Sequence, residues 1–184
     1  YNLKKHKEFF YLDLFVYLIP ISIILGNLVI NVVSVISVLV YLFLISKKKE
    51  IYNKYKSFFI FFYYFSIFLI INLLSSKNFL PTLISILGVI KYYFLFLTIL
   101  YCINEIENFK NNFLKIIFIL LMFVIIDVLI QHFFLRDIFG YEISSSHGRR
   151  LSGPFGDELV AGSFITKLLF LGCIYFSTLK LGKK

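Results

Sequence analysis

Apolar runs of roughly 17 to 22 residues recur along the whole chain. An α-helix rises about 1.5 Å per residue, so a run of this length spans the roughly 30 Å hydrocarbon core of a bilayer. A soluble core does not require that length repeatedly, and 60% of the residues are hydrophobic and 20% aromatic. We therefore predict an all-α fold, a polytopic transmembrane helix bundle that forms a single transmembrane domain over residues 1–184.

The first apolar stretch, Phe9–Ile45, is too long for one crossing, because a single helix over it would measure roughly 50 Å. Gly26 and Asn27 interrupt it, and lysines flank both of its ends, so we expect two helices that turn at these two residues. Four further runs bring the expected number of spans to about six. The spans are expected near residues 9–26, 28–45, 58–74, 81–103, 113–134 and 159–179.

Lysine and arginine are distributed unevenly over the two sides of this arrangement. Thirteen fall on one side: Lys4, Lys5, Lys7, Lys47, Lys48, Lys49, Lys54, Lys56, Lys110, Lys115, Lys180, Lys183 and Lys184. Four fall on the other: Lys77, Arg136, Arg149 and Arg150. The positive-inside rule assigns the first side to the cytoplasm, so we expect both termini there. Because the charge of +9 lies in clusters between apolar runs, we expect the bilayer and not nucleic acid as a partner.

Three charged residues lie well inside the apolar runs, away from their ends: Lys91, Asp127 and Lys167. Each lies about 12 to 15 Å of helix rise from the non-cytoplasmic end of its span, which predicts one shared layer. Charges there are costly, so they should face the bundle interior. Asp127 either forms a structural ion pair with a lysine, or the two lysines leave a positive site that fits an anion. Gln131 is four residues after Asp127, so both point the same way from one helix.

Residues 136–158, here called the polar loop, are rich in small, charged and turn-forming residues. Gly153 and Pro154 predict a turn, and Asp157 is placed to cap the next helix. All arginines of the chain lie in this loop, and the forked donors of Arg149 and Arg150 match phosphate oxygens. The arginines could instead contact lipid headgroups.

The sequence contains no pattern that predicts a metal site or a cofactor. Cys102 and Cys173 both fall inside apolar runs, where a free cysteine packs as a small apolar residue. Glu158, just after the polar turn, is a candidate base, although a carboxylate by itself is weak evidence for catalysis.

At RRLSGPFGDELVAGSFITK the chain resembles the O-antigen polymerase and ligase family of bacterial membrane glycosyltransferases. The preceding run DVLIQHFFLRDIFGY is similar to the family's helix with Asp and Gln, followed by an aromatic turn containing glycine. Together the two runs cover about a third of the chain. The matching positions are Asp127, Gln131, Gly140, Tyr141, Arg150, Ser152, Gly153, Phe155, Gly156, Asp157, Glu158 and Gly162.

The resemblance implies a GT-C-like, multi-pass enzyme of the bacterial inner membrane that acts on undecaprenyl-diphosphate-linked glycans at the periplasmic side. It would polymerise oligosaccharide repeat units; the alternative is an O-antigen ligase that transfers the glycan to lipid A core. A chain-length regulator is a further candidate partner. The family's later helices do not follow here, so we expect an amino-terminal fragment that is inactive alone.

The site residues follow from the resemblance and from the charges. Arg149, Arg150, Lys91 and Lys167 would hold the diphosphate, while Asp127 and Gln131 orient that layer. Arg150 and Glu158 are the candidate catalytic residues. A transporter of an anionic lipid or sugar could also use intramembrane lysines paired with an aspartate, and a structural membrane subunit would tolerate replacement of the charged residues.

Overall fold

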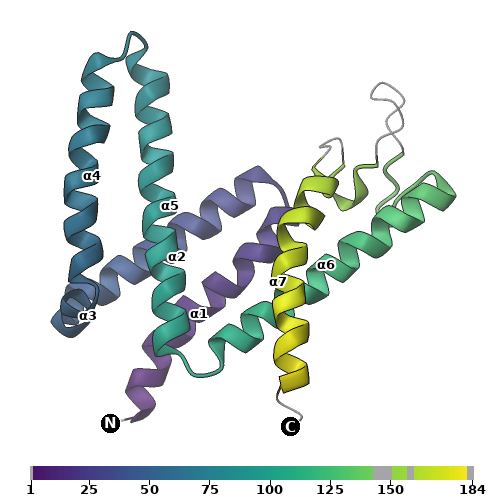
Figure 1. Cartoon of the computed structure of the whole chain (residues 1–184), viewed down its shortest axis with the longest axis horizontal. Helices are drawn as coiled ribbons and strands as arrows, with labels where there is room; N and C mark the ends of the chain where they lie inside the picture. The colour runs from purple at the N-terminus through teal and green to yellow at the C-terminus, as the bar shows by residue number, and fades with distance from the viewer. Residues whose placement is uncertain (1, 143–150, 157–159, 182–184) are drawn as a thin grey trace. The chain divides into compact units, whose positions relative to one another are not determined.

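The structure is a computed structural model that describes residues 2–142, 151–156 and 160–181 (Figure 1). Within these ranges every regular element is a helix, and the one β-type pairing is an isolated bridge between Arg136 and Glu142. The all-α fold class is therefore confirmed. The elements are α1 (Asn2–Ile24), α2 (Asn27–Lys47), α3 (Lys49–Lys54), α4 (Lys56–Ser75), α5 (Phe79–Glu105), α6 (Phe109–Phe134), the 3₁₀ turn η2 (Gly153–Phe155) and α7 (Ala161–Leu181).

Each of the six ranges expected to cross a membrane contains a helix. Four of these helices, α2, α4, α5 and α6, are long and apolar enough for a crossing by their length and composition. Over the described residues the apolar parts of α1 and α7 are shorter, at Tyr11–Ile24 and Ala161–Ser177. The break expected at Gly26 and Asn27 is present, because α1 ends at Ile24 and α2 begins at Asn27. Gly26 has a φ of 103°, which a residue with a side chain rarely adopts.

The helices group into two compact units. Unit 1 consists of Tyr1–Val16 and Ser34–Asn104, and unit 2 consists of Tyr17–Val33 and Glu105–Lys184. The helices α1 and α2 contribute to both units, since the boundaries fall within them.

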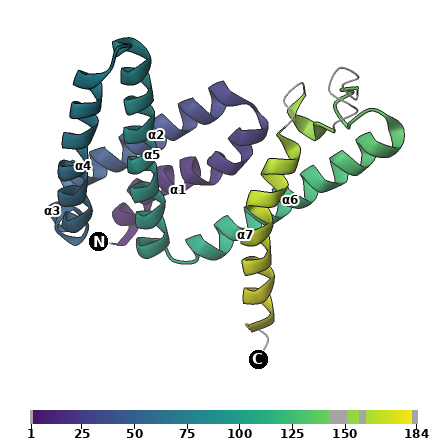
Figure 2. The same ribbon diagram turned by 45° about the horizontal axis from the view of Figure 1, so that its top comes forward.

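Unit 1 is built largely from aromatic contacts. Tyr41 and Tyr101 are buried with ring centroids 5.5 Å apart. The helices α4 and α5 run side by side and are joined by a short turn, as both views show (Figures 1 and 2). The ring of Phe62 stacks on that of Tyr93 at 4.9 Å, and the Tyr93 hydroxyl donates a hydrogen bond to the carbonyl of Phe58 at 2.6 Å. No residue of α4 is buried.

Unit 2 is organised around α6, which contributes a row of buried residues along its whole length. They are Phe109, Leu114, Ile117, Leu121, Val124, Asp127 and Gln131. Near the start of the row, the ring of Phe109 stacks on Tyr17 with centroids 4.8 Å apart. The helix α7 packs on α6, and both helices are seen in Figure 2. The row ends in two polar residues, which marks the place where α6 meets the polar loop.

A glycine lets α6 and α7 approach closely. A Cβ atom added at Gly172 of α7 would lie 3.0 Å from Cδ2 of Leu121 and 3.6 Å from Cδ2 of Phe118, both on α6. An added Cβ at Gly162, on the same helix, would meet nothing within 4 Å. The two glycines therefore form a matched pair, one at the helix contact and one in open space.

We expect Gly172→Ile to lower the stability of the protein by about 1–3 kcal/mol more than Gly162→Ile, because only the first side chain overpacks the contact. Both substitutions introduce the same side chain on the same helix, so the comparison tests the packing at Gly172. The measurement is the midpoint of thermal aggregation of the detergent-solubilised protein. Equal midpoints for the two variants would show that α6 and α7 do not pack through Gly172.

Candidate functional site

The end of α6 carries Asp127 and Gln131, whose side chains are both fully buried at 0% exposure. They are spaced i, i+4 on one helix, so they lie one above the other on one face, as expected from the sequence. Both side chains contact the backbone of the polar loop. The sequence predicts that they orient a layer of charges that binds a ligand, and this stays a prediction; the structure shows that they hold the loop.

The amide of Gln131 joins two separate stretches of the polar loop. Its Oε1 accepts a hydrogen bond from the backbone N–H of Gly153 at 2.9 Å. Its Nε2 lies 3.3 Å from the hydroxyl of Ser152 and 3.4 Å from the carbonyl of Tyr141, to both of which it donates. One side chain therefore holds two stretches of the loop, at Tyr141 and at Ser152 and Gly153, to the same helix turn.

Asp127 completes this attachment. Its Oδ1 accepts a hydrogen bond from the backbone N–H of Ile138 at 2.8 Å. Its Oδ2 is buried and has no hydrogen-bond partner among the described residues. Within unit 2 Asp127 forms no ion pair with a described lysine, Lys167 included, so the structural ion pair considered above is not made there. This carboxylate oxygen can therefore still accept a hydrogen bond from another group.

Asp137 is a buried residue that the sequence reading missed. Its Oδ1 accepts a hydrogen bond from the N–H of Tyr141 at 2.6 Å, and its carbonyl accepts one from Gly140 at 3.1 Å. The signal was present in the sequence, because Asp at the first position and Gly at the fourth are typical of a type I turn.

Arg136 pairs with Glu142 at 2.6 Å, but both side chains are more than 60% exposed, so the pair adds little stability.

The turn expected at Gly153 and Pro154 is confirmed as the 3₁₀ turn η2. Gly153 has a φ of 58°, and an added Cβ would lie 2.8 Å from Cγ2 of Val128. A glycine is therefore required twice over, by the backbone conformation and by the approach of the turn to α6.

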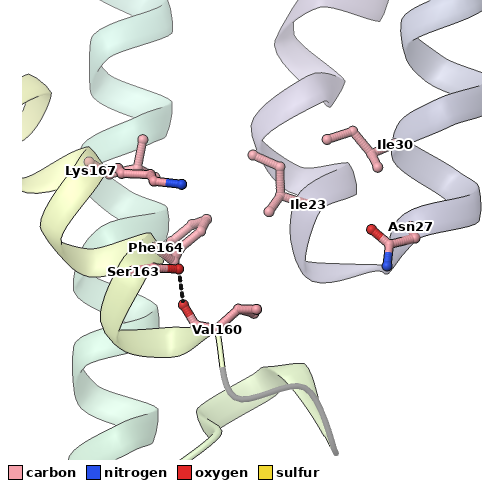
Figure 3. Close-up of a pocket in the computed structure, with 8 residues that line it drawn as sticks. Ile23, Asn27, Ile30, Val160, Ser163, Phe164 and Lys167 are labelled. Carbon is pink, nitrogen blue, oxygen red and sulfur yellow. Dashed lines mark hydrogen bonds between the residues drawn. The ribbon is translucent and has the colours of Figure 1, made fainter. Parts of the chain in front are cut away.

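Lys167 lines a pocket in unit 2, formed by the turn between α1 and α2 on one side and by the first turns of α7 on the other (Figure 3). Its volume is about 300 Å³. The ammonium group of Lys167 extends from α7 toward Ile23 and Ile30, as Figure 3 shows. The lining residues are Ile23, Asn27, Ile30, Val160, Ser163, Phe164, Lys167 and Leu168.

The pocket combines apolar walls with a single charge. Lys167 is exposed and has no ion-pair partner among the described residues. The hydroxyl of Ser163 is used locally, since it donates to the carbonyl of Val160 at 2.9 Å. The pocket therefore offers an ammonium group with apolar side chains around it, which fits a ligand with an anionic group next to a hydrocarbon part.

The remaining residues of the expected site lie elsewhere. Lys91 is half-buried on α5 in unit 1, with its ammonium group 4.4 Å from the centre of the Tyr92 ring. Asp127, Gln131 and Lys167 belong to unit 2, so the layer that would join them to Lys91 stays a prediction. Arg149, Arg150 and Glu158 lie outside the described residues, as does Asp157, the expected helix cap.

Comparison of the chain with protein-family models, with curated proteins and with solved structures found no match.

We expect Gly153→Ala to release η2 from α6. Alanine at a positive φ costs about 1–2 kcal/mol, and the new Cβ would also collide with Val128. Gly140→Ala is the matched control, because Gly140 has a φ of 88° but open space around it. The measurement is amide hydrogen exchange in residues 136–142 and 151–156, which should accelerate about fivefold or more in Gly153→Ala.

A second variant separates the collision from the backbone strain. In Gly153→Ala combined with Val128→Ala, the colliding methyl group is gone, so exchange should return to the level of Gly140→Ala. If Gly153→Ala exchanged no faster than Gly140→Ala, the close approach of η2 to α6 would not hold.

Proposed function

We propose that this chain is part of a membrane glycosyltransferase that polymerises undecaprenyl-diphosphate-linked oligosaccharide repeat units on the periplasmic side of the bacterial inner membrane. In this proposal six helices cross the bilayer, both termini of the chain are cytoplasmic, and the fold is GT-C-like. The likeness of the runs around Asp127 and Arg150 to the O-antigen polymerase and ligase family supports it. The apolar helices α2, α4, α5 and α6 support the membrane setting.

The observation that carries the proposal is the pocket at Lys167. A polyprenyl diphosphate has a long hydrocarbon chain attached to an anionic group, and the pocket has apolar walls beside one ammonium group. An unpaired ammonium within an apolar run is costly unless an anion or water reaches it. The diphosphate would supply that anion, with Lys167 bound to its oxygens and the first isoprene units against Ile23, Ile30 and Leu168.

The attachment of the polar loop is the second support. Because Gln131 holds Tyr141 and Gly153 on α6 and Asp127 holds Ile138, the stretch between Tyr141 and Gly153, which carries Arg149 and Arg150, starts and ends at fixed points. Glu158 follows this stretch. In the proposal these two arginines reach the diphosphate together with Lys167.

The proposed reaction is a displacement at the anomeric carbon of the donor glycan. The acceptor sugar's hydroxyl oxygen forms the new glycosidic bond, and the bond between that carbon and the diphosphate oxygen breaks. The leaving lipid diphosphate takes the electron pair, and the arginines and Lys167 stabilise its added charge. Glu158 is the candidate that accepts the proton of the hydroxyl, and Arg150 is the candidate that acts most directly on the leaving group.

We expect Lys167→Gln in the intact protein to lower polymer formation by about 10- to 100-fold, the value of one charge-assisted hydrogen bond. Lys167→Arg keeps the charge and should retain part of the activity. Lys110→Gln, at the exposed start of α6 and away from the pocket, is the matched control. The measurement is polymer chain length on gels of membranes with equal amounts of protein. Normal chain length in Lys167→Gln would remove Lys167 from the site.

We expect Arg150→Ala to abolish polymer formation while the protein still inserts into the membrane at its normal level. The assay follows labelled lipid-linked repeat units and separates three products. A polymerase yields longer lipid-linked chains, a ligase moves the glycan to lipid A core, and a transporter moves the lipid across the bilayer without a new glycosidic bond. Full activity of Arg150→Ala would contradict the role given to this arginine.

A further inference from the structure

We propose that the turn between α4 and α5 is a second binding site, specific for an anionic glycerophospholipid whose headgroup carries both phosphate and hydroxyl groups, such as phosphatidylglycerol. This site lies in unit 1 and is independent of the pocket at Lys167 and of the glycosyltransferase activity. We call it the headgroup pocket. It has a volume of about 400 Å³ and is lined by Asn72, Ser76, Lys77, Asn78, Pro81, Thr82 and Ser85.

The hydroxyl groups of the headgroup pocket form a closed set of hydrogen bonds that fixes the turn. Thr82 Oγ1 donates to the carbonyl of Asn78 at 2.9 Å, so the 2.6 Å contact between Ser76 Oγ and Thr82 Oγ1 has Ser76 as its donor. The backbone N–H of Asn78 then donates back to Ser76 Oγ at 3.1 Å. Ser85 donates to the carbonyl of Pro81 at 3.0 Å. The walls of the pocket are therefore pre-organised, which lowers the entropic cost of binding.

Three side chains of the pocket are left without a hydrogen-bond or ion-pair partner among the described residues: Asn72, Lys77 and Asn78. All three are exposed. Asn72 is the most informative, since it lies inside the apolar run of α4, close to Ile71 and Leu74, which are also exposed. An amide in hydrocarbon costs about 2 kcal/mol or more unless it is hydrogen-bonded, so a ligand that supplies a hydrogen bond would stabilise this side chain in a membrane.

The charge of the hairpin formed by α4 and α5 favours an anion as the ligand. Lys77 is the one charged residue in the pocket lining, and residues 51–104 contain no Asp or Glu. No carboxylate within residues 51–104 can therefore neutralise Lys77, and Glu105 lies at the opposite end of α5. A phosphate group on Lys77 would do so, while the amides of Asn72 and Asn78 can donate to and accept from hydroxyl groups.

The surroundings of the pocket favour a lipid over a soluble phosphate. Leu74, Phe79 and Leu80 are close in sequence to the lining residues and are 78%, 57% and 65% exposed. Polar groups that bind a headgroup thus lie beside apolar side chains that can contact its acyl chains. This pairing of a small polar pocket with an apolar rim matches an amphiphile in a membrane.

The experiment counts lipids bound to the intact protein by native mass spectrometry after titration with phosphatidylglycerol or phosphatidylcholine. Wild type should prefer phosphatidylglycerol. Lys77→Gln should reduce that preference about fivefold, the effect of one lysine near a membrane surface. Asn72→Leu leaves every charge in place and removes only the amide, so its expected loss is about two- to tenfold. Lys56→Gln, an exposed lysine at the other end of α4, is the matched control and should change little.

Several outcomes would overturn the proposal. Equal losses in Lys77→Gln and Lys56→Gln would mean that any surface lysine attracts the lipid. An unchanged preference in Asn72→Leu would show that charge alone acts, without a built pocket. If soluble glycerol phosphate displaced the lipid at equal concentration, the ligand of this pocket would be a free phosphate ester and not a lipid. Size-exclusion profiles identical to wild type confirm that the variants are folded.

Discussion

Hydrogen bonding of the backbone is the constraint on which this structure depends. In apolar surroundings each backbone N–H and C=O must find a partner within the protein, and a helix supplies these partners locally. The chain follows this rule over α1 to α7. The polar loop is the main departure among the described residues, and there the side chains of Asp127 and Gln131 supply what the helix no longer does. Two polar residues at the end of one helix thus make the irregular backbone possible.

The pattern of apolar residues predicted the helices well, because the length of an apolar run and its interruption at Gly26 depend only on local geometry. The turn at Gly153 and the shared face of Asp127 and Gln131 were predictable for the same reason. The partners of these side chains were not. Asp127 binds the amide of Ile138, and a sequence does not reveal how a loop folds back on its helix.

The two pockets show the same chemical arrangement in separate parts of the chain. Each has one lysine without an ion-pair partner among the described residues, and each has apolar side chains close to that lysine. In the pocket at Lys167 the apolar residues form the walls, whereas in the headgroup pocket they form the rim. Under the two proposals, the first arrangement would enclose part of a hydrocarbon chain and the second would leave the chains outside. The two proposed lipids would then differ in where the hydrocarbon starts relative to the charge.

Gln131 holds the polar loop at two points, and this affects how freely the length of the loop between them can vary. Tyr141 and Gly153 are held to one helix turn whatever connects them. Doubling the length of such a connection costs only about 0.6 kcal/mol of closure entropy. An insertion between these two anchors therefore costs little closure entropy, so the length of this connection can vary while both anchors stay on α6.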